Sequence, residues 1–167
     1  MSRTVSLTFR EAMNSQESAD VIIALLTISH PSYAEPLRLS SDPTTRLSET
    51  PIQYGTVSRG ETYLFCPFSA SLPDDVGERA PTARLMLENV SRDLVTLIRS
   101  MPSPASATIE LVLASSPDAV EIEYPSFQVR NASYNANVLT LELSIDALTD
   151  EPFPAGTFNP SSFPGLF

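Results

Sequence analysis

Val21-Ile-Ile-Ala-Leu-Leu-Thr-Ile28 is an apolar run broken only by its threonine, and His30-Pro31 follows it. A run of this length that is rich in apolar and β-branched residues and closed by a proline is typical of a strand covered on both faces. We therefore place the centre of the hydrophobic core at residues 21–28.

Other segments on both sides of this run are rich in strand-forming residues, and most of them alternate apolar and polar residues, which is typical of strands with one buried face. The expected strands are Val5–Phe9, Leu37–Ser40, Glu61–Ala70, Thr82–Glu88, Ala107–Leu113, Val120–Tyr124, Ser126–Ser133 and Val138–Ile145. Pro67 should place the far half of the 61–70 strand at an edge or a bulge. The polar stretch 44–60 predicts a loop with one short strand.

Two segments favour helices. Residues 91–101 place Leu94, Leu97, Ile98 and Met101 on one helical face, with Ser91 as a cap and Pro102 as a stop. Residues 10–18 lose the alternation and predict a short N-terminal helix. Many short strands with few helices predict a mainly β fold, an antiparallel β-sandwich or a barrel-like domain, over residues 1–150.

Residues 151–167 have a different composition from the rest. They hold four of the chain's eight phenylalanines and four of its fifteen prolines, with no charge after Glu151. Prolines favour extended backbone, so this segment is predicted to be an arm that cannot bury its own rings. It either wraps its own domain or docks on another copy or another protein. The predicted interface residues are Phe153, Phe158, Phe163, Leu166 and Phe167.

The residues that catalysis requires are few. His30 is the only histidine and Cys66 the only cysteine, which excludes an internal disulfide and a structural zinc site. Cys66 lies in an apolar setting and is expected to be a buried thiol, and His30 is expected to be structural or exposed. Phosphate-binding and nucleophile motifs are absent, and the paired carboxylates lack calcium-loop spacing. We therefore expect no catalytic, cofactor-binding or metal site.

The net charge is −10, and all ten positive residues are scattered arginines. Binding of a nucleic-acid backbone requires clustered cations, so we expect no specific nucleic-acid binding. The sequence contains neither a signal-peptide pattern nor a run of eighteen apolar residues, so we expect a soluble intracellular protein without membrane insertion.

Three segments carry a resemblance to a known family: Thr4–Ser18 (TVSLTFREAMNSQES), Leu37–Asp42 (LRLSSD) and Phe158–Phe167 (FNPSSFPGLF). They resemble a family of tailed-bacteriophage proteins, catalogued as a domain of unknown function, whose genes follow the tape-measure gene among those for minor tail and tail-tip proteins. The resemblance implies a structural virion protein of a long, non-contractile tail, made in the bacterial cytoplasm and located at the tail tip.

The same resemblance implies a ring of β-sandwich domains that joins the tail tube protein to the baseplate hub protein. A hexameric distal-tail ring is the first expectation, and a trimeric hub-side protein is the second. Two other classes stay open. An adaptor or assembly chaperone would dock a phage or host partner through the arm, and an enzyme would use Cys66 or a carboxylate pair as a hydrolase.

Overall fold

The computed structural model describes residues 5–71, 82–88, 103–124, 126–135 and 138–145. Within these ranges it contains one helix, α1 (Leu7–Asn14), and eleven strands. The strands are β1 (Ile22–Ser29), β2 (Leu37–Ser40), β3 (Thr45–Glu49), β4 (Ile52–Ser58), β5 (Glu61–Phe65), β6 (Phe68–Ser71), β7 (Thr82–Glu88), β8 (Ser106–Leu113), β9 (Ser116–Glu123), β10 (Phe127–Tyr134) and β11 (Val138–Ser144). The prediction of a mainly β fold is confirmed.

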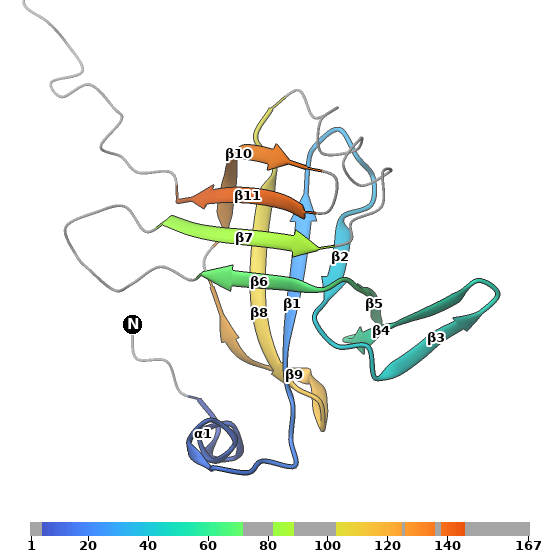
Figure 1. Ribbon diagram of the computed structural model, residues 1–167, viewed down its shortest axis with the longest axis vertical. Helices are drawn as coiled ribbons and strands as arrows, with labels where there is room; N and C mark the ends of the chain where they lie inside the picture. The colour runs from blue at the N-terminus through green and yellow to red at the C-terminus, as the bar shows by residue number, and fades with distance from the viewer. Residues whose placement is uncertain (1–4, 72–81, 89–102, 125, 136–137, 146–167) are drawn as a thin grey trace, which may run out of the picture.

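All the strands are joined in one hydrogen-bonded path. Their order is β3-β4-β5-β2-β1-β8-β10-β11-β7-β6, and β9 pairs with β8 beside this path. The pairings are antiparallel except for β2 with β5, which run parallel over two residue pairs. The path changes direction where β10 meets β8 (Figure 1), and only Phe127 and Gln128 pair across that junction.

The bend produces two layers. Figure 1 shows β6, β7, β10 and β11 crossing in front of β1 and β8, as in orthogonal sheet packing. The main core lies between the layers. It contains Leu26 and Ile28 from β1, Ala107 and Ile109 from β8, Phe127 from β10, Leu85 and Leu87 from β7, and Leu139, Leu141 and Leu143 from β11. Burial of these alternating side chains is the main stabilising contribution to the fold.

A second, smaller core covers the opposite face of β1 and β8. It contains Ile23, Leu25, Tyr63 and Val112, with Val120 packed against them. Because residues 23 and 25 point to one side of β1 and residues 26 and 28 to the other, both faces of this strand are buried. The prediction that the run at 21–28 lies at the centre of the core, covered on both faces, is confirmed.

The N-terminal prediction is partly wrong. Residues 5–9 were expected to form a strand, whereas α1 begins at Leu7. The Ser6 hydroxyl accepts a hydrogen bond from the Phe9 backbone N–H at 3.1 Å and so caps the helix. The helix expected at 10–18 exists, but it covers Leu7–Asn14. Among the described residues, no helix has the length and apolar character needed to cross a membrane.

Most of the remaining strand predictions are confirmed. The strands expected near 37–40, 82–88, 107–113, 120–124, 126–133 and 138–145 are present. The segment 61–70 forms β5 and β6, divided at Cys66-Pro67, and β6 pairs with β7 alone among the described strands, as the edge prediction required. The stretch 44–60 was expected to be a loop with one short strand, whereas it contains two strands, β3 and the whole of β4. The helix predicted at 91–101 and the boundary at residue 150 lie outside the described residues.

Candidate interaction surface

The predicted interface residues Phe153, Phe158, Phe163, Leu166 and Phe167 lie outside the described residues. Their role stays a prediction. The described part of the chain offers two kinds of candidate: the chemically reactive side chains that the sequence singled out, and a surface that the sequence did not predict.

His30 is buried at the end of β1, and both of its ring nitrogens are engaged. Nδ1 accepts a hydrogen bond from the Ser32 backbone N–H at 3.0 Å, so the proton resides on Nε2, which donates to the Ser103 hydroxyl at 2.8 Å. These bonds hold the connection after β1 against residue 103. The arrangement satisfies both polar atoms of a buried imidazole.

Cys66 is buried between β5 and β6, as predicted. Its Sγ lies 3.8 Å from the carbonyl oxygens of Pro67 and Glu88. Burial raises the pKa of the Cys66 thiol above its usual value, which opposes formation of the reactive thiolate. Neither ring nitrogen of His30 is directed to it. Within the described ranges, no group of three or more His, Cys, Asp or Glu side chains could hold a metal ion.

The raised pKa of Cys66 makes stability depend on pH. Because the folded state holds the thiol proton more tightly than the unfolded state, the contribution is fully present below about pH 8.5 and is lost as the pH rises toward the folded-state pKa. We expect the free energy of unfolding to fall by up to about 1 kcal/mol between pH 7.5 and 9.5. Urea titrations should show a smaller fall for Cys66→Ala; equal falls would contradict this assignment.

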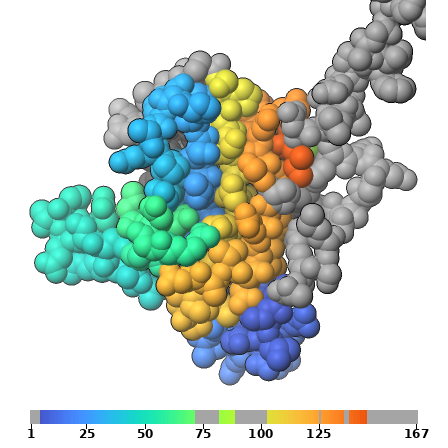
Figure 2. Space-filling view, turned by 180° about the vertical axis from the view of Figure 1, so that it is seen from behind, coloured from blue at the N-terminus to red at the C-terminus, as the bar shows by residue number. Residues whose placement is uncertain are grey.

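The second candidate is the β3–β4 hairpin, which stands away from the two layers (Figure 1). Figure 2 shows it from behind as the teal projection at one side of the molecule, with α1 in dark blue beneath β9. Most side chains of the hairpin's outer half are exposed, and Ile52 is 61% exposed. β4 and β5 together carry five of the ten exposed large hydrophobic residues of the described ranges: Ile52, Tyr54, Val57, Leu64 and Phe65.

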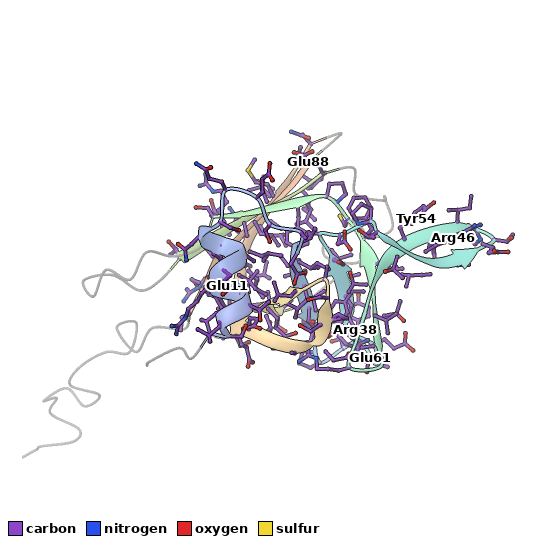
Figure 3. All side chains as sticks on the ribbon, turned by 90° about the horizontal axis from the view of Figure 1, so that it is seen from below. Glu11, Arg38, Arg46, Tyr54, Glu61 and Glu88 are labelled. Atoms are coloured by element: carbon purple, nitrogen blue, oxygen red, sulfur yellow. The ribbon has the colours of Figure 1, made fainter. Side chains whose placement is uncertain are left out.

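A bulge determines which side chains share a face of the hairpin. Arg46 pairs with Tyr54 and Glu49 with Ile52, and the register shifts between Arg46 and Ser48. The extra residue, Leu47, brings Arg46 and Glu49 to the same face, where their side chains form an ion pair at 3.8 Å. This face therefore presents a tyrosine, an isoleucine and one charge of each sign. Figure 3 shows Arg46 and Tyr54 far from Glu11 of α1.

The root of the hairpin is fixed to the body by Arg59 in the β4–β5 turn. Arg59 and Gly60 both have positive φ, 53° and 80°, as in the two-residue turns that connect tight hairpins. The guanidinium binds both carboxylate oxygens of Glu110 in β8, with Nη1 2.9 Å from Oε1. Hydrogen bonding to Glu110 raises the pKa of Arg59 above its usual value, so the guanidinium stays charged at every ordinary pH.

Two further bonds join the same turn to β9. Ser58 donates its hydroxyl to the Pro117 carbonyl at 2.7 Å, and the Arg59 backbone N–H donates to the Asp118 carboxylate. The turn is thus fastened to both β8 and β9. We call the set of Ser58, Arg59, Glu110, Pro117 and Asp118 the root clasp. A projecting hairpin with a clasped root is held in a defined direction, which suits it to contact another molecule.

The comparison with protein families supplies the remaining observation. A family model described as a domain of unknown function, DUF1833, matches residues 8–158. The chain belongs to the DUF1833 family. The match covers the described β-domain from within α1 onward, and it ends inside the predicted arm, after Phe158 and before Phe163. No curated protein matches the chain.

Gly55 allows β4 and β5 of this DUF1833 domain to approach closely. A Cβ at this position would lie 1.9 Å from the Tyr63 carbonyl oxygen, a backbone atom that cannot move alone. Gly55→Ala should therefore destabilise the domain by about 2 kcal/mol, measured by urea unfolding. The control is Gly60→Ala, which meets nothing within 4 Å and costs only its positive φ, about 1 kcal/mol. Equal costs would contradict the close approach.

Sequence reasoning missed both the hairpin and the root clasp of the DUF1833 domain. One short strand was predicted in this stretch, but β3 and the outer half of β4 contain no buried side chain, so their sequence lacks the clear alternation that is typical of a strand with a buried face. One signal was available for the clasp: Glu110 interrupts an apolar strand on the face opposite Ile109 and Leu111. That face was assumed to be solvated, whereas the second core buries it.

Proposed function

We propose that this protein is a structural subunit of a phage tail tip that assembles into a closed ring, a hexamer in the first place and a trimer in the second. The observation that carries the proposal is the clasped, projecting β3–β4 hairpin. The resemblance of residues 4–18, 37–42 and 158–167 to tail-tip proteins supplies the biological setting.

The physical argument starts from the hairpin's marginal stability. A two-stranded hairpin with both faces in water is marginally stable on its own, and three or more strands or a packed face are needed for stability. Here the inner half is secured by β5 and the root clasp, whereas the outer half, with Ile52 and Tyr54, is exposed. Contact with another subunit would bury this apolar area. A subunit that functions by assembly accounts for such a feature without any catalytic group.

The proposed neighbours are other copies of the chain, the tail tube protein and the baseplate hub protein. The Phe/Pro arm at 151–167 would add to the contacts between subunits by lying on a neighbour. The net charge of −10 supports a position around a channel that DNA passes, because an acidic wall does not bind the phosphate backbone.

Light scattering on the purified chain tests this proposal, with full-length protein measured beside a chain that ends at Glu151. We expect a hexamer or trimer for the full chain and a folded monomer for the truncated chain. A truncated chain that unfolds would show that the arm belongs to its own core. A full chain that stays monomeric and gains mass only when a partner is added would favour the adaptor over the ring.

A further inference from the structure

Three exposed apolar side chains share one face of β4 and β5. Thr56 and Tyr63 lie opposite each other in the register of these strands, and both are buried. Because side chains alternate along a strand, Tyr54 and Phe65, each two residues farther from the body, point to the same side. They are 43% and 37% exposed, and Ile52 continues the row on β4. The buried face thus extends outward as an exposed one, which we call the aromatic face: Ile52, Tyr54 and Phe65.

The chemistry of the aromatic face favours an uncharged partner. The charged side chains of β3, Arg46 opposite Tyr54 and Glu49 opposite Ile52, form an ion pair with each other and so balance their charges. Exposed aromatic rings of this kind bind extended, proline-rich segments, because the pyrrolidine rings pack on them and the stiff segment loses little conformational entropy on binding. The face therefore fits a segment that is rich in proline and apolar side chains.

The chain itself contains such a segment. Residues 152–167 hold four prolines and four phenylalanines and have no charged side chain. β11, the last described strand, lies on the side of the molecule opposite the β3–β4 hairpin in both views (Figures 1 and 2). The residues that follow Ile145 could span up to about 70 Å when extended. The arm therefore begins on the side opposite its own aromatic face and is long enough to reach the aromatic face of a neighbour.

We propose that the arm of one copy lies across the aromatic face of the next copy, with its prolines against Tyr54 and Phe65 and its phenylalanines over the apolar surface around Ile52. The contact joins unlike surfaces, so it is head-to-tail, and head-to-tail contacts close into rings when the rotation allows it. The inference rests on the proposed ring and assigns the surface on which the arm docks.

Disulfide trapping tests the contact in the full chain. In a Cys66→Ala background, Glu49→Cys, which lies opposite Ile52 beside the aromatic face, is combined with Ser162→Cys in the arm under mild oxidation. The two single variants, mixed before assembly, should give a covalent dimer, and each variant alone should give none. Gln53→Cys is the control, because it lies on β4 but points to the opposite face. Its mixture with Ser162→Cys should give no dimer.

The concentration dependence of assembly, measured by light scattering, gives an independent test. Tyr54→Ser removes an exposed ring from the aromatic face and should move the assembly midpoint about tenfold higher in concentration. Its melting temperature should change little, because the ring is exposed within one copy. Val57→Ser changes a side chain of nearly the same exposure on the opposite face of β4 and should leave the midpoint unchanged. Equal assembly of the two variants would overturn the docking site.

The outcomes separate the two proposals. A ring that gives no disulfide between positions 49 and 162 and assembles normally with Tyr54→Ser would overturn the docking site and leave the ring standing. A disulfide that forms only within single chains of the double variant, with no dimer from the mixture, would overturn the inference by placing the arm on its own domain. A full chain that is monomeric at all concentrations would overturn both proposals.

Discussion

Replacing Phe127 with alanine should destabilise the fold by about 4 kcal/mol, in the range measured for buried phenylalanines. Phe127 is 0% exposed and begins β10. It pairs with Ala107 at the two-residue junction where the sheet bends from β8 into the front layer. Truncation therefore opens a cavity where the two layers meet, and the short junction offers little freedom to close it. Urea unfolding at neutral pH measures the loss.

Met86→Ala is the matched control for this prediction. Met86 lies in β7 between the fully buried Leu85 and Leu87, but it is itself 41% exposed. Its truncation removes a side chain of similar reach from the solvent face and should cost less than about 1 kcal/mol. A Phe127→Ala cost no larger than that of Met86→Ala would show that the layers are held together elsewhere.

Strands with one or two buried faces were predictable from the sequence because burial leaves a pattern. β7 and β11 alternate because one face of each lies on the main core, as Leu85, Leu87, Leu139 and Leu141 show. β1 is a continuous apolar run because it lies between two cores. In both cases the sequence pattern reflects which faces of the strand are buried away from water.

The N-terminal helix was misread because its determinant lies far away in the sequence. Val5, Leu7 and Phe9 alternate like a strand, but Glu121 in β9 accepts hydrogen bonds from both the backbone N–H and the hydroxyl of Ser6, at 2.9 and 2.7 Å. These bonds hold the capping residue in place, and the burial of Phe9 anchors the first turn. A short segment with weak local preference takes the conformation that its tertiary contacts select.

The candidate surface was unpredictable for a related reason. β3 and the outer half of β4 have no buried face, so their strands depend on backbone pairing, on the close approach at Gly55 and on the root clasp. The clasp joins Arg59 to a residue 51 positions away. The lone Glu110 in an apolar strand indicates a buried charge, but neither sequence periodicity nor composition identifies Arg59 as its partner, and the structure is needed to find it.

Arg59→Met should destabilise the domain by about 3 kcal/mol, because it keeps the length of the side chain but leaves the carboxylate of Glu110 buried without a counter-ion. Glu110 is 8% exposed and lies beside Leu25 in the register of β1 with β8. Most of the lost stability thus comes from leaving the Glu110 carboxylate buried without a counter-ion. The loss of a surface attraction is a smaller part, since the Arg59 side chain is itself 42% exposed.

A double-mutant cycle with Glu110→Gln distinguishes these contributions by urea unfolding. Glu110→Gln alone removes the charge but keeps an amide that can bond the guanidinium, so it should cost about 1 kcal/mol. In the double variant no charge is left in the second core, and the total cost should be smaller than that of Arg59→Met alone. Additive costs would mean that Arg59 and Glu110 act independently, and the root clasp would then not be what fixes the direction of the hairpin.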